Sequence, residues 1–375
     1  MVNKKKLHVA LLFGGRSGEH EVSLMSARSV LSVLDPSKYD VTQIGITREG
    51  QWLTGEDVIS AFESGKINDL NRVIIPCEPS HSAIYGLRST KIGEKLETLT
   101  AIDVFFPLLH GTFGEDGTIQ GLFEMADVAY VGAGVVGSAV GMDKGVFKDV
   151  MRFHQIPSVE SVIVLRSEIE KDMNAIIEKA EKVSTYPIFT KPANLGSSVG
   201  VTKCRTRSDL QEGLLEAALY DRRVLVERGV ANVREIEVSV LGNDDPRASV
   251  PGEVLPSREF YSYESKYIDG TSGLLIPAPL PAETAARIQD LAVRAYKAID
   301  AAGMARVDFF LDKDSGEVYL NELNTIPGFT KISMYPKLWE ATGMTYSELV
   351  DRLIDLAIQR KAERDRTSHT YRSQS

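Results

Sequence analysis

The sequence contains little cysteine and no long apolar run. Its two cysteines, Cys77 and Cys204, are far apart, which excludes a disulfide framework or a cysteine-based zinc site and suits a reducing cytoplasm. The longest uncharged run, Val128–Met142, is shorter than the roughly 20 residues of a membrane-spanning helix. The apolar stretch after Lys4–Lys6 lacks the cleavage pattern of a signal peptide. We therefore expect a soluble, cytoplasmic protein without a membrane segment.

The sequence also lacks an excess of positive charge. Its 43 Lys and Arg residues are outnumbered by 52 Asp and Glu residues, so the formal net charge is −9. Nucleic-acid-binding surfaces are basic, so we expect no nucleic-acid partner, although a local basic pocket for a small phosphorylated ligand stays open. Apolar residues make up 43% of the 375 residues, which is typical of globular proteins and excludes intrinsic disorder.

Alternating strand and helix patterns predict an open parallel α/β sheet at the N-terminus. The apolar runs Leu7–Phe13 and Ala101–Leu109 end at glycine turns, as buried strands do, and Glu21–Leu34 has helical spacing with Ser23 as a candidate cap. The later pattern of strands and helices predicts two α+β domains. The expected organisation is an α/β domain at 1–140, α+β domains at 141–226 and 227–360, and a polar tail at 361–375.

Two glycine-rich segments are candidates for phosphate binding. Gly132–Gly137 fits the G-x-G-x-x-G pattern, but no acidic residue ends a second strand about 20 residues later, so we interpret it as an interdomain turn. Gly196–Gly200, which includes Ser197 and Ser198, lies between two β-rich runs and follows Lys191. Its N–H and hydroxyl groups could surround phosphates, although a plain hairpin turn is the simpler interpretation of this segment alone.

Two β-rich segments near the C-terminus carry polar residues two positions apart, on one face of each strand. They are Arg306-Val-Asp308 and Glu322-Leu-Asn324. On neighbouring strands these segments would gather two carboxylates and an amide oxygen, which suits Mg²⁺ bound with nucleotide phosphates. The alternative is two solvent-facing strand edges, but the apolar residues that flank them indicate the border of a core.

Two loops follow the predicted buried strands of the first domain. His110–Gly117 begins where a strand ends, which is where ligands bind in open α/β sheets, so His110 is either a site residue or a structural one. Gly14–Ser23 occupies the equivalent place after the first strand. Its Glu19 is a candidate for binding a substrate ammonium group, or an acid favoured at the start of a helix.

Taken in order, these motifs resemble the D-alanine–D-alanine ligase family of the ATP-grasp superfamily, from about residue 6 to 358. The resemblance implies a three-domain ATP-grasp architecture, with an N-terminal α/β (pre-ATP-grasp) domain and two α+β domains that grip ATP. It also implies an ATP-dependent ligase that forms D-alanyl phosphate and then D-alanyl-D-alanine for peptidoglycan synthesis, with a homodimer as the expected assembly. The matching segments are Gly14–Ser23, His110–Gly117, Met142–Lys144, Lys191–Pro192, Gly196–Gly200, Arg234–Glu237, Tyr263–Tyr267, Arg306–Asp308 and Asn321–Thr330.

The resemblance also assigns roles to residues. Two Mg²⁺ or Mn²⁺ ions would be bound by Asp308, Glu322 and Asn324. Glu227 would face adenine, and Glu235 would bind ribose with Glu237 as a competing candidate. The full set expected to bind ATP is Lys144, Lys191, Ser197, Ser198, Glu227, Glu235, Lys266 and Asn321.

For the substrates, Glu19 would bind the ammonium group of the first D-alanine, with His110 near its carboxylate, and Ser333 would bind the carboxylate of the second. Arg306 and the Gly328 N–H would stabilise the tetrahedral oxyanion. Glu19, Ser197 and Tyr267 would form a hydrogen-bonded triad. This triad would tie the phosphate loop and a Tyr261–Ser272 loop into a lid over the acylphosphate.

Two other functions stay open. A ligase that joins D-alanine to D-lactate or D-serine would share nearly every phosphate-binding residue. A nucleotide-binding regulatory protein without catalysis would be expected to lack some of the residues Arg306, Asp308, Glu322 and Asn324, and all four are present.

We predict that Tyr267→Phe admits D-lactate as second substrate, especially at lower pH. In the resembled family the tyrosine of the Lys266-Tyr267 pair accompanies dipeptide formation, and its loss would remove one hydrogen bond, worth about 0.5–1.5 kcal/mol. Dipeptide and depsipeptide yields from a mixture of D-alanine and D-lactate between about pH 6 and 9 measure this change. Unchanged selectivity would mean that Tyr267 only packs under its loop.

Overall fold

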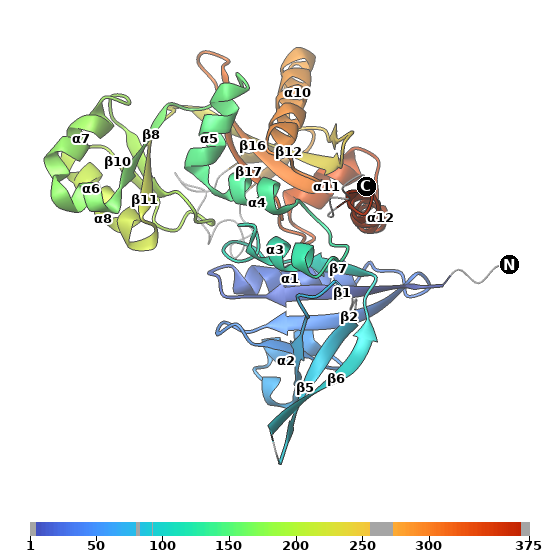
Figure 1. Cartoon of the computed structure of the whole chain (residues 1–375). Coiled ribbons are helices and arrows are strands. Elements are labelled where there is room, and N and C mark those ends of the chain that lie inside the picture. Colours follow the sequence, from blue (N-terminus) through green and yellow to red (C-terminus); the bar gives the residue numbers. More distant parts are fainter. Residues whose placement is uncertain (1–4, 80–82, 92, 256–272, 369–375) are drawn as a thin grey trace, which may run out of the picture.

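The computed structural model describes residues 5–79, 83–91, 93–255 and 273–368, and within these ranges the strands form three sheets. Figure 1 shows the N-terminal sheet at the bottom, the second sheet as a separate lobe, and the third sheet above the first. Lys266, Tyr267 and the proposed lid segment Tyr261–Ser272 lie outside the described residues.

The first sheet contains a parallel centre, as expected. β1 (Leu7–Gly14) lies between β2 (Tyr39–Ile46) and β7 (Val104–Pro107) and is parallel to both. The remainder of the sheet, however, is antiparallel and continues outward from β2, so the expected open parallel sheet is correct only for these three strands. The antiparallel strands are β3 (Trp52–Thr54), β4 (Asn71–Ile74), β5 (Ala83–Thr90) and β6 (Gly93–Ala101).

Helix α1 (His20–Leu31) begins before the residue predicted to cap it. Ser23 lies inside the helix, where its hydroxyl accepts a hydrogen bond from Gly14 N at 2.7 Å and donates one to Leu108 O at 2.5 Å. Ser23 therefore holds the ends of two buried strands together instead of capping the helix.

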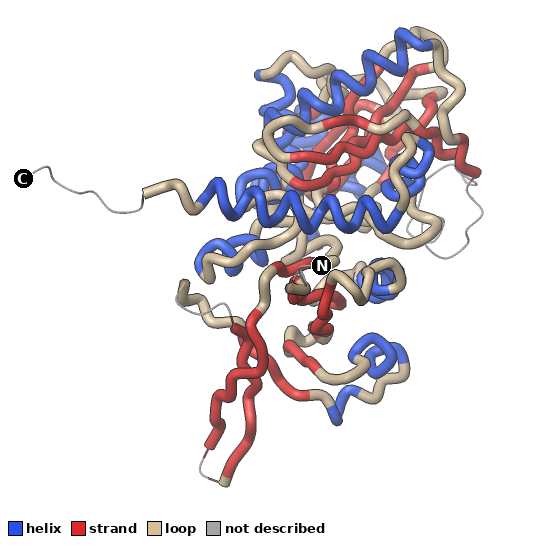
Figure 2. Tube along the Cα trace, turned by 90° about the vertical axis from the view of Figure 1, so that its right-hand side faces the viewer, coloured by secondary structure: helices blue, strands red, loops and turns tan. Residues whose placement is uncertain are grey.

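At the far end of this domain, β5 and β6 form a hairpin that projects from the body (Figure 2). The remaining helices of this domain are α2 (Val58–Glu63), the 3₁₀ helix η1 (Ile67–Asp69) and α3 (Thr118–Met125).

The second sheet is antiparallel throughout and has the order β10-β9-β11-β8. Its β11 (Arg223–Arg228) extends past residue 226, so the predicted boundary between the second and third domains falls inside this strand. Asp172 separates two helices of this domain and caps the second of them through Ala175 N. The other elements are α4 (Val135–Met142), α5 (Lys144–Phe153), β8 (Ser161–Leu165), α6 (Arg166–Lys171), α7 (Met173–Glu181), β9 (Ile188–Pro192), β10 (Thr202–Cys204) and α8 (Arg207–Tyr220).

The third sheet has the order β15-β14-β12-β16-β17, with β13 beside β12. Its helix α12 (Tyr346–Arg364) belongs to the same buried apolar cluster as β1 and β7 of the first domain, including Leu353, Phe106 and Phe329. The first and third domains therefore share a core, and this fixes their relative position. The other elements are β12 (Val233–Gly242), β13 (Arg247–Ala248), β14 (Gly252–Leu255), β15 (Gly273–Leu275), α10 (Ala282–Ala298), β16 (Gly303–Asp312), β17 (Val318–Asn324) and α11 (Met334–Ala341).

The glycine motif at 132–137 has a packing role in this fold. Gly134 precedes α4, and a Cβ on Gly137 would lie 2.9 Å from Asp300 O and 3.0 Å from Ala301 Cα. A larger residue would push α4 away from the third domain.

Among the helices in the described ranges, none is both long and apolar enough to cross a membrane.

Candidate functional site

A cleft of about 690 Å³ lies between the second and third sheets. Strands β9 and β11 form one wall and β12, β16 and β17 the other. Most residues expected to bind ATP or metal line this cleft: Lys144, Lys191, Ser197, Ser198, Glu227, Glu235, Asp308, Asn321 and Glu322.

The predicted oxygen ligands are brought together by the pairing of β16 with β17. Asp308 lies directly opposite Glu322, and Arg306 opposite Asn324. The register shifts after Asp308, so Asn321 is an extra residue in β17, and for this reason both Asn321 and Glu322 line the cleft. In the described part of the chain, no group of three or more His, Cys, Asp or Glu side chains could hold a metal ion. The predicted ligands at this place are two carboxylates and an amide.

Arg306 is held by two carboxylates. Its Nε and Nη2 atoms donate to the two oxygens of Asp308, each at 2.7 Å, and its Nε lies 3.0 Å from Glu237 Oε2. Asp308 Oδ2 also accepts a hydrogen bond from Asn324 Nδ2 at 3.1 Å. Glu237 thus contacts Arg306, whereas Glu235 lies two residues before Glu237 on β12, opposite Phe310.

Lys144 links the predicted phosphate loop, Gly196–Gly200, to the carboxylates of β16 and β17. Its Nζ donates to Leu195 O at 2.7 Å and lies 4.0 Å from Glu322 Oε2. The preceding Asp143 caps α5 through Gly145 N and Val146 N, both at 3.0 Å, and this cap fixes where Lys144 leaves the helix. The same carboxylate forms an ion pair with Arg223 and bonds Asn194 Nδ2 at 3.2 Å.

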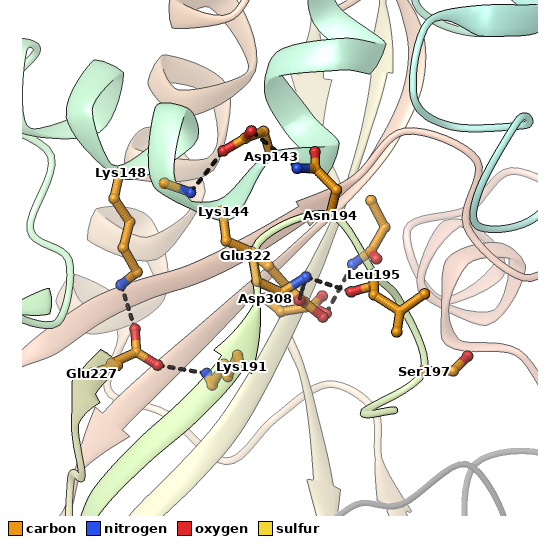
Figure 3. A network of polar contacts seen from close by, with 12 residues as sticks. Asp143, Lys144, Lys148, Lys191, Asn194, Leu195, Ser197, Glu227, Asp308 and Glu322 are labelled. Carbon is orange, nitrogen blue, oxygen red and sulfur yellow. Dashed lines mark hydrogen bonds and ion pairs between the residues drawn. The ribbon is translucent and has the colours of Figure 1, made fainter. Parts of the chain in front are cut away.

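Glu227 lies at the opposite end of the cleft, enclosed between Lys148 and Lys191 (Figure 3). Lys191 Nζ donates to Glu227 Oε2 at 2.5 Å, and Lys148, which pairs with Oε1, also donates to Val159 O at 3.1 Å. Burial would raise the pKa of Glu227, but the two ammonium groups outweigh it and lower this pKa to about 2. Burial likewise opposes the charge of Lys191, yet Glu227 raises its pKa. Sequence reasoning missed Lys148, because a lysine on an amphipathic helix gives no signal that its side chain is buried.

The phosphate loop adopts a backbone that favours glycine at two serines. Ser197 and Ser198 have φ values of 54° and 58°, a conformation that costs on the order of 1 kcal/mol or more per residue. Ser197 Oγ donates to Glu19 Oε1, so two members of the predicted Glu19–Ser197–Tyr267 triad are joined. Cβ atoms on Gly196 and Gly111 would lie 2.9 Å and 2.6 Å from Glu19 Oε2, so only glycine at both positions leaves room for this carboxylate.

A second, narrow cavity of about 50 Å³ continues from the cleft into the first domain. Its walls include Glu19 and His110 from the first domain and Arg306 and Gly328 from the third. Four residues line both cavities, so the two are contiguous: Lys144, Gly196, Ser197 and Glu322. Ser333 is not among the residues that line this cavity in the described part of the chain, and its hydroxyl instead accepts from Thr330 N at 3.0 Å.

His110 is buried and both of its ring nitrogens bond protein groups. Nδ1 lies 2.9 Å from Ile326 O, and Nε2 lies 2.9 Å from Ser26 Oγ. Burial lowers the pKa of His110, so the ring is neutral; a carbonyl can only accept, so Nδ1 carries the hydrogen. This arrangement leaves no ring nitrogen to bind the substrate carboxylate that the sequence analysis assigned to His110.

Glu115 also lines this cavity. Like Lys148, it is a residue that the sequence did not indicate. Its Oε1 accepts a hydrogen bond from Ile326 N at 2.9 Å, and its Oε2 accepts one from Gly111 N at 2.8 Å. Burial, followed by the nearby charge of Glu19, raises the pKa of Glu115 to about 8. A cation near both carboxyl groups would lower this electrostatic cost.

Comparisons with known proteins agree with this arrangement. Residues 8–133 match the family model of the D-ala D-ala ligase N-terminus, and residues 150–355 match that of the D-ala D-ala ligase C-terminus. The D-alanine–D-alanine ligase of Heliobacterium modesticaldum is 50% identical over 97% of this chain and 98% of its own length.

Two solved structures share the fold. The D-alanine–D-alanine ligase of Coxiella burnetii is 34% identical with a TM-score of 0.83, and covers 96% of both chains. The VanG D-Ala:D-Ser ligase of Enterococcus faecalis is 36% identical with a TM-score of 0.81, over 94% of this chain and 100% of that one.

We predict that Lys148→Met destabilises the protein by about 3 kcal/mol, because it leaves Glu227 buried with one ammonium group in place of two. Arg152→Met is the matched control on the same helix. Its ion pair with Asp149 is exposed, so the change should cost less than about 0.5 kcal/mol. Urea unfolding of both variants measures the difference, and equal stabilities would contradict the importance of the buried pair.

Proposed function

The chain belongs to the D-alanine–D-alanine ligase family and is an ATP-dependent ligase that joins two D-alanine molecules; we propose that this reaction takes place where the cleft meets the narrow cavity. The observation that carries the proposal is that Lys144, Ser197 and Glu322 line both spaces. A nucleotide in the cleft would therefore present its terminal phosphate to a carboxylate in the cavity. Phosphoryl transfer requires such positioning and charge neutralisation more than covalent help from the protein.

We propose that adenine lies at the Glu227 end of the cleft and the phosphates at the Asp308 end. Glu235 is the ribose ligand in this arrangement, because Glu237 is engaged with Arg306 and lies opposite Asp308. Lys191, which pairs with Glu227, and Lys144, which lies beside the loop, neutralise the phosphates between these ends.

Asp308, Glu322 and Asn324 fit a magnesium or manganese site by their chemistry, because all three offer hard oxygen atoms and line the phosphate end. We propose that two ions are held there with the help of phosphate oxygens. When bound, such ions neutralise the charge that develops on the transferred phosphoryl group. Asp308 can serve as a ligand if Arg306 gives up part of its bidentate contact, and Glu237 offers Arg306 a second carboxylate.

The narrow cavity provides the groups for the two substrates. We propose that Glu19 binds the ammonium group of the first D-alanine close enough to Glu115 to lower the pKa of that carboxyl group. This placement directs the substrate carboxylate toward the cleft. That carboxylate attacks the γ-phosphorus, ADP leaves, and an acylphosphate forms. The amine of the second D-alanine then attacks the acyl carbon, and the resulting oxyanion is stabilised by Arg306 and the Gly328 N–H before phosphate leaves.

We retain Ser333 as the proposed ligand of the carboxylate of the second D-alanine. Ser333 lies at the start of α11, five residues after Gly328. The roles of Lys266 and Tyr267 stay predictions from the sequence.

We further propose that the enzyme is cytoplasmic, where ATP is available, and that it forms a homodimer. The exposed apolar side chains of Met125 and Val136 are candidates for the subunit interface.

Asp308→Asn and Glu322→Gln should each reduce dipeptide formation by on the order of 100-fold, because they preserve shape but remove a charged metal ligand. Asp312→Asn is the matched control, since Asp312 also lies on β16 but its carboxylate bonds the backbone of Asp314 and Ser315. A phosphate-release assay coupled to dipeptide detection measures the effect. Full turnover of Asp308→Asn at millimolar-range Mg²⁺ would contradict the assignment.

Binding of D-alanine should release close to one proton near neutral pH. The pKa of Glu115 is raised to about 8, so the group is mostly protonated at about pH 7, and a neighbouring ammonium group lowers this pKa and expels the proton. Above about pH 9 the carboxyl is already ionised and the release should disappear. Titration calorimetry in buffers of different ionisation enthalpy measures it, and Glu115→Gln should release none. Heats independent of buffer near pH 7 would disprove this placement of the ammonium group.

A further inference from the structure

Three side chains of the first domain hydrogen bond the backbone of Thr325–Phe329, the segment of the third domain that carries Gly328. Glu115 accepts from Ile326 N at 2.9 Å, and His110 donates to Ile326 O at 2.9 Å. Ser26 Oγ accepts from Phe329 N at 3.2 Å. The peptide groups on both sides of Gly328 are thus fixed by side chains from another domain.

The hydrogens along these contacts can be assigned consistently. Because His110 Nδ1 donates to Ile326 O, its Nε2 must accept, so Ser26 Oγ donates to Nε2 at 2.9 Å while accepting from Phe329 N. Glu115 uses its second oxygen to accept from Gly111 N at 2.8 Å. Each group has a partner of the opposite kind, so the contacts form one connected network.

We propose that Glu115 is a positioning residue for ligation: with Ser26 and His110 it sets the Gly328 N–H relative to the first-substrate cavity. This inference rests on the proposed role of Gly328 in binding the oxyanion. Glu115 spans the two parts that must be aligned, since one of its oxygens bonds Gly111 of the first domain and the other bonds Ile326 of the third. A Cβ on Gly111 would lie 2.6 Å from Glu19 Oε2, so the Gly111 backbone lies beside the proposed ligand of the first D-alanine.

The proposal has a specific kinetic consequence. Acylphosphate formation depends on the cleft, whereas attack by the second amine depends on the oxyanion donors. A donor displaced by a fraction of an ångström loses much of its stabilising effect. Loss of the Glu115 contact should therefore slow the second step more than the first, and acylphosphate that is not attacked by the amine is hydrolysed by water.

The test compares Glu115→Gln with Asp116→Asn in the full-length protein. An amide nitrogen cannot accept a hydrogen bond, so the glutamine side chain of the E115Q variant must lose one of the two backbone contacts, whichever protonation state the native glutamate has. Asp116 is the matched control, because its carboxylate also accepts two backbone hydrogen bonds, but both come from its own loop, from Phe113 N at 2.8 Å and Thr118 N at 3.0 Å. The readouts are phosphate released per dipeptide formed, the KM for ATP, and hydrogen exchange of the peptide that covers Thr325–Phe329.

For E115Q we expect a dipeptide rate reduced by roughly 10- to 100-fold, with more phosphate than dipeptide. We also expect an unchanged KM for ATP and faster exchange in Thr325–Phe329. D116N should keep one phosphate per dipeptide and native exchange in that segment. If E115Q is not recovered folded, Ser26→Ala, which removes the contact to Phe329 N, should show the same excess of phosphate.

Tight coupling and native exchange in the tested variant would overturn the proposal, and so would equal losses in E115Q and D116N. Failure of the proposed function is distinguishable, because it would appear as a lack of dipeptide formation in the unmodified protein. Hydrogen exchange reports on the network independently of turnover.

Discussion

The cleft depends on the neutralisation of carboxylates that are removed from water. An isolated buried charge costs several kcal/mol, so each acid of the site must be paired with a cation or with N–H donors. Glu227 is paired with two lysines, and Asp308 with Arg306 and Asn324. These pairs divide the cleft into an end where two ammonium groups surround one carboxylate and an end where two carboxylates share one guanidinium group.

This division explains why the two ends suit different parts of a nucleotide. At Glu227 two ammonium groups surround one carboxylate, so this group carries a net positive charge, and the low pKa shows that the ion pairs outweigh burial. At Asp308 one guanidinium group is shared between two carboxylates, so this group of three side chains carries a net negative charge that favours a cation. A polyphosphate with its metal ions would add charge of both signs at this second end, which is the end that can accept it.

The sequence was sufficient for those parts of the fold and site that depend on local patterns. The parallel pair of buried strands, the Asp308 and Glu322 segments and the serine-glycine loop all follow from periodicity and spacing, and the family resemblance placed them in one enzyme. Lys148, Glu115 and Ser26 could not be found in this way, because their partners are distant in sequence and often backbone atoms, which no residue pattern marks. The same reason explains the error on Ser23, whose local context fits a cap but whose hydroxyl bonds two strand ends.

The shared core of the first and third domains holds the residues that make these distant contacts close to one another. Phe106, Phe329 and Leu353 lie in one apolar cluster, so Thr325–Phe329 packs against the first domain through Phe329. The second domain contributes to the site instead through its loop, where Ser197 has a positive φ and contacts Glu19 by a hydrogen bond. Rigid packing therefore fixes the groups proposed to act on the acyl carbon, whereas the groups proposed to cover the phosphates are held mainly by polar contacts. Polar contacts exchange partners at lower cost than a packed core, so the phosphate side is the part of the site best suited to open for ATP and ADP.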